Sequence, residues 1–336
     1  MTSAIEPYRL YGSNPSPYSR KLRAILRYRR LPHVWKIGTA DTLPEIAQVR
    51  PKLVPILKVP ETGEFLVDST PIAYALEQRH PDQRSIVPPD AGDAFLCHLL
   101  EDFADEWVSK AMFHYRWHED ATAEWAGHWI VRDAMPHFTG KMHEQGAKMF
   151  HDRQRSRMAM VGCTPANAPV IEGSYERLLD VLGAYVGGVH FLFGSRPSLA
   201  DFALYGQLAQ LVTDPWPQRV CRARAPAVEA WVITLDDCGG NEGQWKPESA
   251  AAVRDGLLEM VGAEYLPFLV ANTQALEAGA SEVRVQIRGR PYTQEPFRYQ
   301  AKCYAELRHR WQTLDAASRE RLQPLLQQTG CLALLE

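Results

Sequence analysis

The chain has 336 residues, which is enough for two domains of ordinary size and a remainder. Hydrophobic residues make up 46% and charged residues 23%, a composition typical of a folded globular protein and wrong for a disordered chain. Lys and Arg number 37 and Asp and Glu 40, so the net charge of −3 gives no sign of a broad surface for nucleic acid or an anionic membrane.

Neither a membrane helix nor a disulfide framework is expected. No stretch reaches the roughly 18 to 20 unbroken apolar residues of a membrane helix, and residues 1–9 lack the apolar core of a signal peptide. The six cysteines form no CxxC pair and no metal-site spacing, which favours free thiols in a reducing compartment. We therefore expect a cytoplasmic protein with no metal, no nucleic-acid partner and no membrane partner.

The first quarter of the chain alternates strand and helix signals. In chain order we expect a strand at 8–11, a helix at 17–30, a strand at 34–37, a short helix at 43–49, strands at 56–59 and 65–67, and a helix at 71–79. The order β-α-β-α-β-β-α predicts a small mixed sheet with helices, an α/β domain over residues 6–85.

The remainder of the chain reads mostly as helix. After a proline-containing linker at 88–93, helical patterns continue to about residue 236 and predict an all-α domain over residues 92–240. Residues 245–336 form a further, mixed but mostly helical extension. In it we expect helix over 247–278, a strand at 281–288, a turn at 289–291, and helices at 297–314 and 316–328, the last capped by Asp315 and Gly330.

The segment from Ser13 to Arg20 contains a candidate catalytic group. Ser16 precedes Pro17, and proline is favoured at the first position of a helix, so Ser16 is the expected N-cap. Its hydroxyl would lie beside free backbone N–H groups at the positive end of the helix dipole. A thiolate placed there would be stabilised, because hydrogen bonds and positive potential favour the charged form. The alternative is that Ser16 only caps the helix.

Two later segments offer binding groups. Val54–Pro55 precedes the strand at 56–59; a cis bond would present the backbone groups of Val54 at the mouth of a site, whereas a trans proline would only begin the strand. Asp68-Ser69-Thr70-Pro71 starts another helix, with Ser69 or Thr70 as the expected cap. Its N–H groups could bind a carboxylate and Asp68 an ammonium group, or the segment could be a cap alone.

These segments, in this order and spacing, resemble the cytosolic glutathione transferases. The matches are LYGSNPSPYSRKLRAIL, the VPIL segment and VDSTPIAYAL in the first domain, and FLFGSRPSLADFALYGQL in the second. In the last of these, Ser198 would cap a helix and Asp201 would complete a capping box. The resemblance covers about residues 6–236. It implies a thioredoxin-like first domain, an all-α second domain and glutathione as co-substrate.

The resemblance also implies roles for single residues. Ser16 matches the activating residue of the serine-type, many of them bacterial, members and would lower the pKa of the glutathione thiol. Ser13 and Tyr11 are alternative donors. No cysteine occurs in the first 96 residues, which argues against a mechanism that uses a protein thiol.

Further positions would bind the rest of glutathione. Val54, next to Pro55, would pair with the cysteinyl part, and Asp68 and Ser69 would hold the γ-glutamyl ammonium and carboxylate. Many members carry a lysine directly before the Val-Pro pair. Here Leu53 stands in that place, so Lys52, or alternatively Lys36, would have to contact the glycyl carboxylate.

The pocket for a small hydrophobic electrophile is expected on the first long helix of the all-α domain, at Trp107, Phe113, His114 and Tyr115. Alternatively, these side chains are core. His114 and His118 share a helix face, but nothing else at metal-ligand spacing joins them.

The expected function is therefore that of a glutathione transferase, and because the family is usually homodimeric, we expect a homodimer. A non-catalytic binding or regulatory module on the same fold is the alternative, because function belongs to sites and not to folds. The C-terminal extension could pack over the active cleft, extend a dimer interface, or simply cover exposed core; we favour the last.

Overall fold

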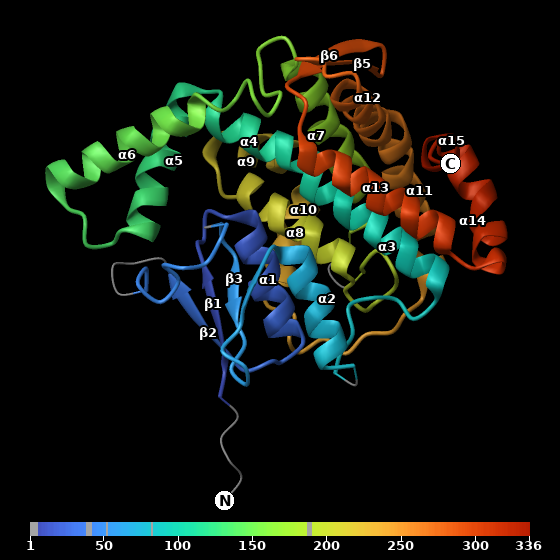
Figure 1. Cartoon of the computed structure of the whole chain (residues 1–336), viewed down its shortest axis with the longest axis horizontal. Helices are drawn as coiled ribbons and strands as arrows, with labels where there is room; N and C mark the ends of the chain where they lie inside the picture. Colours follow the sequence, from blue (N-terminus) through green and yellow to red (C-terminus); the bar gives the residue numbers. More distant parts are fainter. Residues whose placement is uncertain (1–5, 38–41, 52, 82, 187–189) are drawn as a thin grey trace, which may run out of the picture.

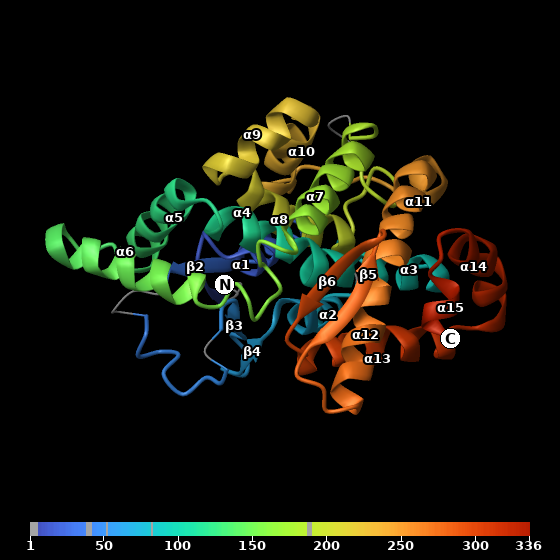
Figure 2. The ribbon, with the colours of Figure 1, turned by 90° about the horizontal axis from the view of Figure 1, so that it is seen from above.

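A computed structural model of the chain describes residues 6–37, 42–51, 53–81, 83–186 and 190–336. Figures 1 and 2 show a small sheet with its helices, a larger helical part above it, and the C-terminal extension along one side. No helix among these residues is both long enough and apolar enough to cross a membrane.

The N-terminal part is a four-stranded mixed sheet with two helices packed on it. Its elements are β1 (Tyr8–Gly12), α1 (Pro17–Tyr28), β2 (His33–Ile37), β3 (Ile56–Lys58), β4 (Phe65–Val67) and α2 (Ser69–Arg79). The strand order is β2-β1-β3-β4; β1 is parallel to β2 and antiparallel to β3, and β4 is antiparallel to β3. Leu10 and Leu57 of the sheet pack against Leu22, Leu26 and Ile72 of the helices. The predicted α/β fold is confirmed.

The short helix predicted at 43–49 is wrong. This segment is a series of turns whose hydrogen bonds join residues three apart, such as Glu45 N–H to the Thr42 carbonyl at 3.1 Å and Val49 N–H to the Ile46 carbonyl at 3.1 Å. Ile46 and Val49 are nevertheless buried and pack against the sheet. The apolar spacing thus marks a buried face, while the local backbone stays too irregular for an α-helix.

The helical part is built around two buried helices. α3 (Ala91–Phe103) continues through a π-helical turn (Ala104–Val108) into α4 (Ser109–Trp117), and all residues of α8 (Leu199–Leu211) are buried. Ser198 accepts from the Asp201 N–H while the Asp201 carboxylate accepts from Ser198, so the predicted capping box is confirmed. The other helices are α5 (Asp120–Ala134), α6 (Gly140–Arg155), α7 (Ala168–Gly183), α9 (Pro215–Arg224) and α10 (Pro226–Asp236). The α5–α6 hairpin projects to one side (Figures 1 and 2).

The extension joins the same hydrophobic core as the helices before it. It consists of a 3₁₀ turn (Pro247–Ala250), α11 (Ala251–Met260), a π-helical turn (Val261–Tyr265), α12 (Leu266–Glu277), β5 (Val283–Ile287), β6 (Arg290–Gln294), α13 (Arg298–Thr313), α14 (Ala316–Gln328) and α15 (Leu332–Leu335). Tyr265, Phe268 and Tyr292 contact the ring of Trp107. The expectation that the extension covers core is confirmed.

One strand of the extension was not predicted. The turn expected at 289–291 is shorter, because Gly289 at φ +74° reverses the chain and β6 begins at Arg290. β5 and β6 then form an antiparallel hairpin. Pro291 gives no strand signal in the sequence, yet it is tolerated in a two-stranded sheet whose outer edges are open.

Candidate functional site

The three predicted segments meet at one end of the sheet. Tyr11 of β1 pairs with Ile56 of β3, and Ile56 pairs with Val67 of β4. The end of β1, the start of β3 and the end of β4 are therefore neighbours. Ser16 follows the first, Val54 precedes the second and Asp68 follows the third, so the fold brings these distant residues to one edge.

Ser16 is the N-cap of α1, as predicted. Its backbone is extended, at φ −95° and ψ 119°, and its Oγ accepts the Ser19 N–H at 3.3 Å. The side chain is half-buried. Over the part of the chain that the structure describes, the Ser16 hydroxyl hydrogen has no acceptor. This hydroxyl can therefore donate to a ligand at the start of the helix.

The two alternative donors are already engaged. The Ser13 hydroxyl donates to Asp133 Oδ2 at 2.9 Å. Tyr11 is fully buried and its hydroxyl donates to Glu45. Burial and this carboxylate raise the pKa of Tyr11 to about 12, so its hydroxyl remains protonated at neutral pH.

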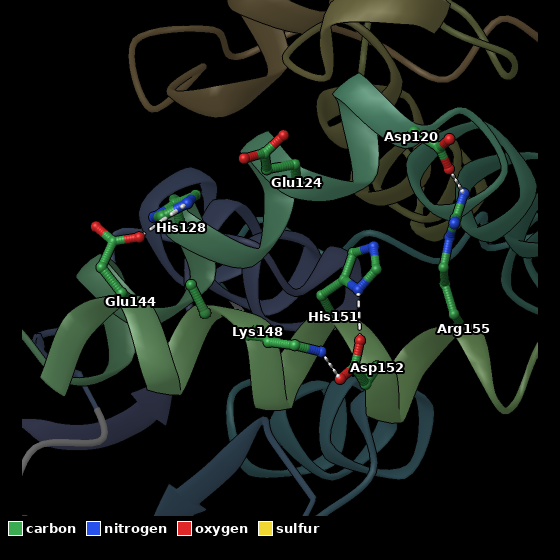
Figure 3. A pocket seen from close by; sticks show the side chains of 9 residues that line it. Asp120, Glu124, His128, Glu144, Lys148, His151, Asp152 and Arg155 are labelled. Carbon is green, nitrogen blue, oxygen red and sulfur yellow. Dashed lines mark hydrogen bonds and ion pairs between the residues drawn. The ribbon is translucent and has the colours of Figure 1, made fainter. Parts of the chain in front are cut away.

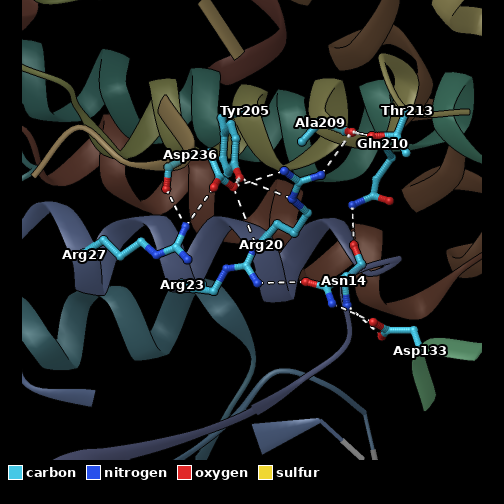
Figure 4. Close-up of polar contacts among 10 residues, drawn as sticks. All are labelled: Asn14, Arg20, Arg23, Arg27, Asp133, Tyr205, Ala209, Gln210, Thr213 and Asp236. Atoms are coloured by element: carbon cyan, nitrogen blue, oxygen red, sulfur yellow. Dashed lines mark hydrogen bonds and ion pairs between the residues drawn. The ribbon is translucent and has the colours of Figure 1, made fainter. Parts of the chain in front are cut away.

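The loop before Ser16 is held by three helices, and Figure 4 shows the contacts from two of them, α5 and α8. Asn14 donates to Asp133 of α5 through its backbone N–H at 2.9 Å and its side chain at 2.6 Å. Gln210 of α8 donates to the Asn14 carbonyl at 3.1 Å. Arg116 of α4 donates to the Pro15 carbonyl at 2.8 Å. These contacts fix the position of Ser16 at the start of α1.

The Val54–Pro55 bond is cis. Pro55 is buried and Val54 half-buried. Within the described ranges, the backbone N–H and carbonyl of Val54 have no hydrogen-bond partner, so both are free to pair with a peptide. Lys52, the expected contact for the glycyl carboxylate, lies outside the described residues, and Leu53 beside it is 68% exposed.

At the start of α2 the predicted cap is wrong by one residue. Asp68, at φ +73°, is the N-cap, and its Oδ1 accepts the Thr70 N–H at 3.4 Å. The sequence favoured Ser69 or Thr70, but the longer carboxylate side chain reaches the Thr70 N–H from the position before them. The buried Ser69 is instead the first helical residue, and its hydroxyl has no partner among the residues with described positions.

Below this helix start lies a buried charged cluster that the sequence did not indicate. Lys21 of α1 is fully buried and pairs with Glu101 at 2.5 Å and Asp105 at 2.6 Å. Thr70 of α2 also donates to Glu101. Burial raises the pKa of Asp105 to about 7, while Lys21 overcomes burial and lowers the pKa of Glu101. Lys21 thus joins α1 to Glu101 of α3 and to Asp105 of the π-helical turn.

The expected electrophile pocket is not assembled from the predicted aromatic residues. Trp107 (2% exposed), His114 (0%) and Tyr115 (2%) are core side chains. Trp107 faces the extension, His114 pairs with Glu172 at 2.9 Å, and Tyr115 packs on Trp216. For these three the core alternative is the correct one. Phe113 alone is half-buried.

The sequence did not suggest Trp129 of α5 as a site residue. It is half-buried and lies under the guanidinium of Arg116, whose carbon is 5.4 Å from the ring centre. It stands one turn before Asp133, so it shares the helix face that meets the Ser13–Asn14 loop. The four-residue spacing was a visible signal, but nothing in the sequence linked α5 to α1.

Two cavities lie away from this edge of the sheet. One of about 480 Å³ lies between α5 and α6 (Figure 3), where Asp120 pairs with Arg155, Glu144 with His128, and Asp152 with Lys148 and His151. The other, of about 310 Å³, lies among α1, α8 and α10 beside Arg20 and Asp236. Four carboxylates, the two cations Lys148 and Arg155, and two histidines line the first cavity. Across the described residues, no group of three or more side chains could hold a metal ion.

Two family models match the sequence. The glutathione S-transferase N-terminal domain matches residues 10–84, and the glutathione S-transferase C-terminal domain matches residues 153–233. The sequence matches none of the curated proteins.

Solved structures of similar proteins include a glutathione S-transferase of Methylobacterium radiotolerans JCM 2831 in complex with glutathione sulfonate, at 21% identity and a TM-score of 0.44 over 74% of this chain and 95% of that one. A second is the beta-etherase LigF of Sphingobium sp. strain SYK-6, at 17% identity and a TM-score of 0.46 over 69% of this chain and 95% of that one. A third is a glutathione S-transferase of Ceriporiopsis subvermispora in complex with glutathione, at 18% identity and a TM-score of 0.45 over 70% of this chain and 98% of that one. On the two domain matches, the chain belongs to the glutathione S-transferase family.

Proposed function

We propose that the protein is a glutathione transferase in which the Ser16 hydroxyl stabilises the thiolate of glutathione. The observation that carries the proposal is that, among the described residues, nothing accepts from the Ser16 hydroxyl at the start of α1, whereas Ser13 and Tyr11 donate to carboxylates. A hydrogen bond to sulfur, together with the positive end of the helix, favours the thiolate and lowers its pKa.

The neighbouring groups support a tripeptide ligand. The backbone groups of Val54, which have no partner among the described residues, suit the cysteinyl part, and Asp68 with Ser69 suits the γ-glutamyl ammonium and carboxylate. The strands leading to these groups are adjacent and spaced by about 4.8 Å, so the binding groups span about 10 Å. Three extended residues have about this length.

The thiolate would attack a small hydrophobic electrophile. The half-buried Phe113 and Trp129 are the aromatic side chains that support such a substrate, since the helices that carry them also hold the loop before Ser16. Holding thiolate and electrophile together supplies the proximity term of the rate enhancement.

The test is a glutathione titration of wild type, Ser16→Ala and Ser13→Ala, with ultraviolet absorbance of the thiolate followed across pH. We expect wild type and Ser13→Ala to lower the thiol pKa and Ser16→Ala to lose the shift. If wild type binds no glutathione, the proposal fails. If all three proteins shift the pKa equally, Ser16 is not the donor.

A non-catalytic binding module is the second candidate, and the burial of Trp107, His114 and Tyr115 favours it, because these rings are closed to an electrophile. It predicts weak or absent glutathione binding, no change in the thiol pKa and no turnover of an aryl halide. Turnover that depends on Ser16 would exclude it.

A further inference from the structure

A tyrosine of the C-terminal extension reaches the candidate glutathione site. The hydroxyl of Tyr299, in the first turn of α13, donates to Asp68 Oδ2 at 2.8 Å across 231 residues of sequence. The other oxygen, Oδ1, accepts the Thr70 N–H. Two donors from separate parts of the chain therefore fix the orientation of one carboxylate.

The carboxylate of Asp68 keeps its capacity for a cationic ligand. An ionised carboxylate has about four acceptor positions, and the two hydrogen bonds use two of them. In the portion of the chain with described positions, no Lys, Arg or His forms an ion pair with Asp68. A neutral hydroxyl satisfies one oxygen without cancelling the charge, so an ammonium group is still attracted.

The position of Tyr299 is itself fixed by buried contacts. Asn272 of α12 is fully buried; its Oδ1 accepts the Phe297 N–H at 2.8 Å and its Nδ2 donates to the Phe297 carbonyl at 3.0 Å. This clamp sets the start of α13 two residues before Tyr299. Burial and the Asp68 charge raise the pKa of Tyr299, so its hydroxyl remains a donor at neutral pH.

Asp68 needs such support because of its backbone. A φ of +73° is uncommon for a residue other than glycine, and it persists only where surrounding contacts hold it. If the Asp68 side chain became ordered only when the ligand arrives, the conformational entropy lost would weaken ligand binding. The hydroxyl of Tyr299 orders it beforehand.

We propose, resting on the proposed function, that Tyr299 is a positioning residue of the glutathione site. It holds the Asp68 carboxylate in the orientation that binds the ammonium group of the γ-glutamyl end. The C-terminal extension is then part of the glutathione site as well as a cover for the core.

The test measures the affinity of the full chain for two probes by calorimetry. One is glutathione; the other is the analogue in which a glutaryl group replaces the γ-glutamyl group, so that only the ammonium is missing. Tyr299→Phe removes one hydroxyl and should weaken glutathione binding about tenfold, as expected for a hydrogen bond to a charged group, while the affinity for the analogue stays unchanged.

Tyr304→Phe is the matched control. Tyr304 lies on the same helix, and its hydroxyl donates to the Leu334 carbonyl at 2.6 Å, away from Asp68. This variant should bind both probes like wild type. A general loosening of α13 would weaken both probes in Tyr299→Phe, which would overturn the positioning role.

A double-mutant cycle with Asp68→Asn measures whether Tyr299 acts on glutathione binding through Asp68, and so separates this effect from a change of fold in Tyr299→Phe. If Tyr299 acts through Asp68, its removal should cost nothing further in the Asp68→Asn background. Unchanged or tighter glutathione binding by Tyr299→Phe overturns the inference alone; tighter binding would show that the hydroxyl competes with the ammonium. No glutathione binding by wild type overturns the proposed function, and this inference with it.

Discussion

Replacing Glu264 with glutamine should loosen the C-terminal extension from the rest of the molecule. Glu264 is fully buried in the π-helical turn between α11 and α12. Its Oε1 accepts from Arg177 Nε at 2.8 Å and Arg288 Nε at 2.6 Å. Its Oε2 accepts from Ser174 Oγ at 2.6 Å and Trp107 Nε1 at 3.2 Å. One carboxylate thus joins the extension to α7 and to the long α3–α4 helix.

Glutamine cannot satisfy these four donors in either orientation. If its oxygen faces Arg177 and Arg288, its NH₂ group points at the indole N–H of Trp107. If its oxygen faces Ser174 and Trp107, the NH₂ group meets two guanidinium groups. Removing one partner of a buried ion pair costs about 3 to 5 kcal/mol. Because glutamine keeps part of the hydrogen bonding, we expect the free energy of unfolding to fall by about 2 to 3 kcal/mol.

Glu259→Gln is the matched control, because the exposed Glu259 pairs with the same Arg288 at 2.5 Å. Its loss should cost less than about 1 kcal/mol. The assay is urea unfolding followed by circular dichroism. With a denaturant dependence of about 3 kcal/mol per molar, Glu264→Gln should lower the midpoint by about 0.7 to 1 M. Equal midpoints for the two variants would refute the idea that Glu264 holds the extension in place.

Three further predictions concern titration and the loop before Ser16. Burial lowers the pKa of Lys110 from 10.5 to about 8, so at a pH between these two values the folded state binds fewer protons than the unfolded state. The free energy of unfolding should therefore rise as the pH increases through this range, by up to about 3 kcal/mol relative to Lys110→Met. Unfolding of both proteins is measured at the lower and the upper end of the range. Although burial opposes it, hydrogen bonds from Tyr205 and Arg20 hold the pKa of Asp236 well below 3.8. The ionised Asp236 should contribute fully to the free energy of unfolding above about pH 4, and this contribution should be lost as the pH falls toward the pKa of Asp236 in the folded state. In urea unfolding, the stability of Asp236→Asn should therefore fall less than that of wild type as the pH is lowered. Asp133→Ala removes three hydrogen bonds from the loop and should speed amide exchange at Ser13, Asn14 and Ser16 about tenfold or more, whereas Asp120→Ala, at an exposed site on the same helix, should leave it unchanged.

The extension is an integral part of this fold. Tyr265, Phe268 and Tyr292 surround Trp107, a ring that the sequence suggested for substrate binding. The nearby Lys110 donates to Gln294 of β6 at 2.6 Å. A helix that would otherwise present large apolar side chains is therefore covered by the chain's own last quarter, which explains why Trp107 cannot line a pocket.

Local signals in the sequence were sufficient for most of the elements and for the caps at Ser16 and Ser198. Ser16 before Pro17, and Ser198 with Asp201, specify helix starts through hydrogen bonds that span three residues. The strands at β1 to β4 follow from short apolar runs. Such features depend on neighbours in the chain, so they can be predicted without knowing what packs on them.

Tertiary structure decided which of these groups meet. The engagement of Ser13 by Asp133, and of Asp68 by Tyr299, joins residues 120 and 231 positions apart. The same packing turned Trp107 inward and left the 43–49 segment as turns. Contacts of this kind depend on how whole helices dock, and a side chain's spacing along one helix is the same whether its face meets a ligand or another part of the chain.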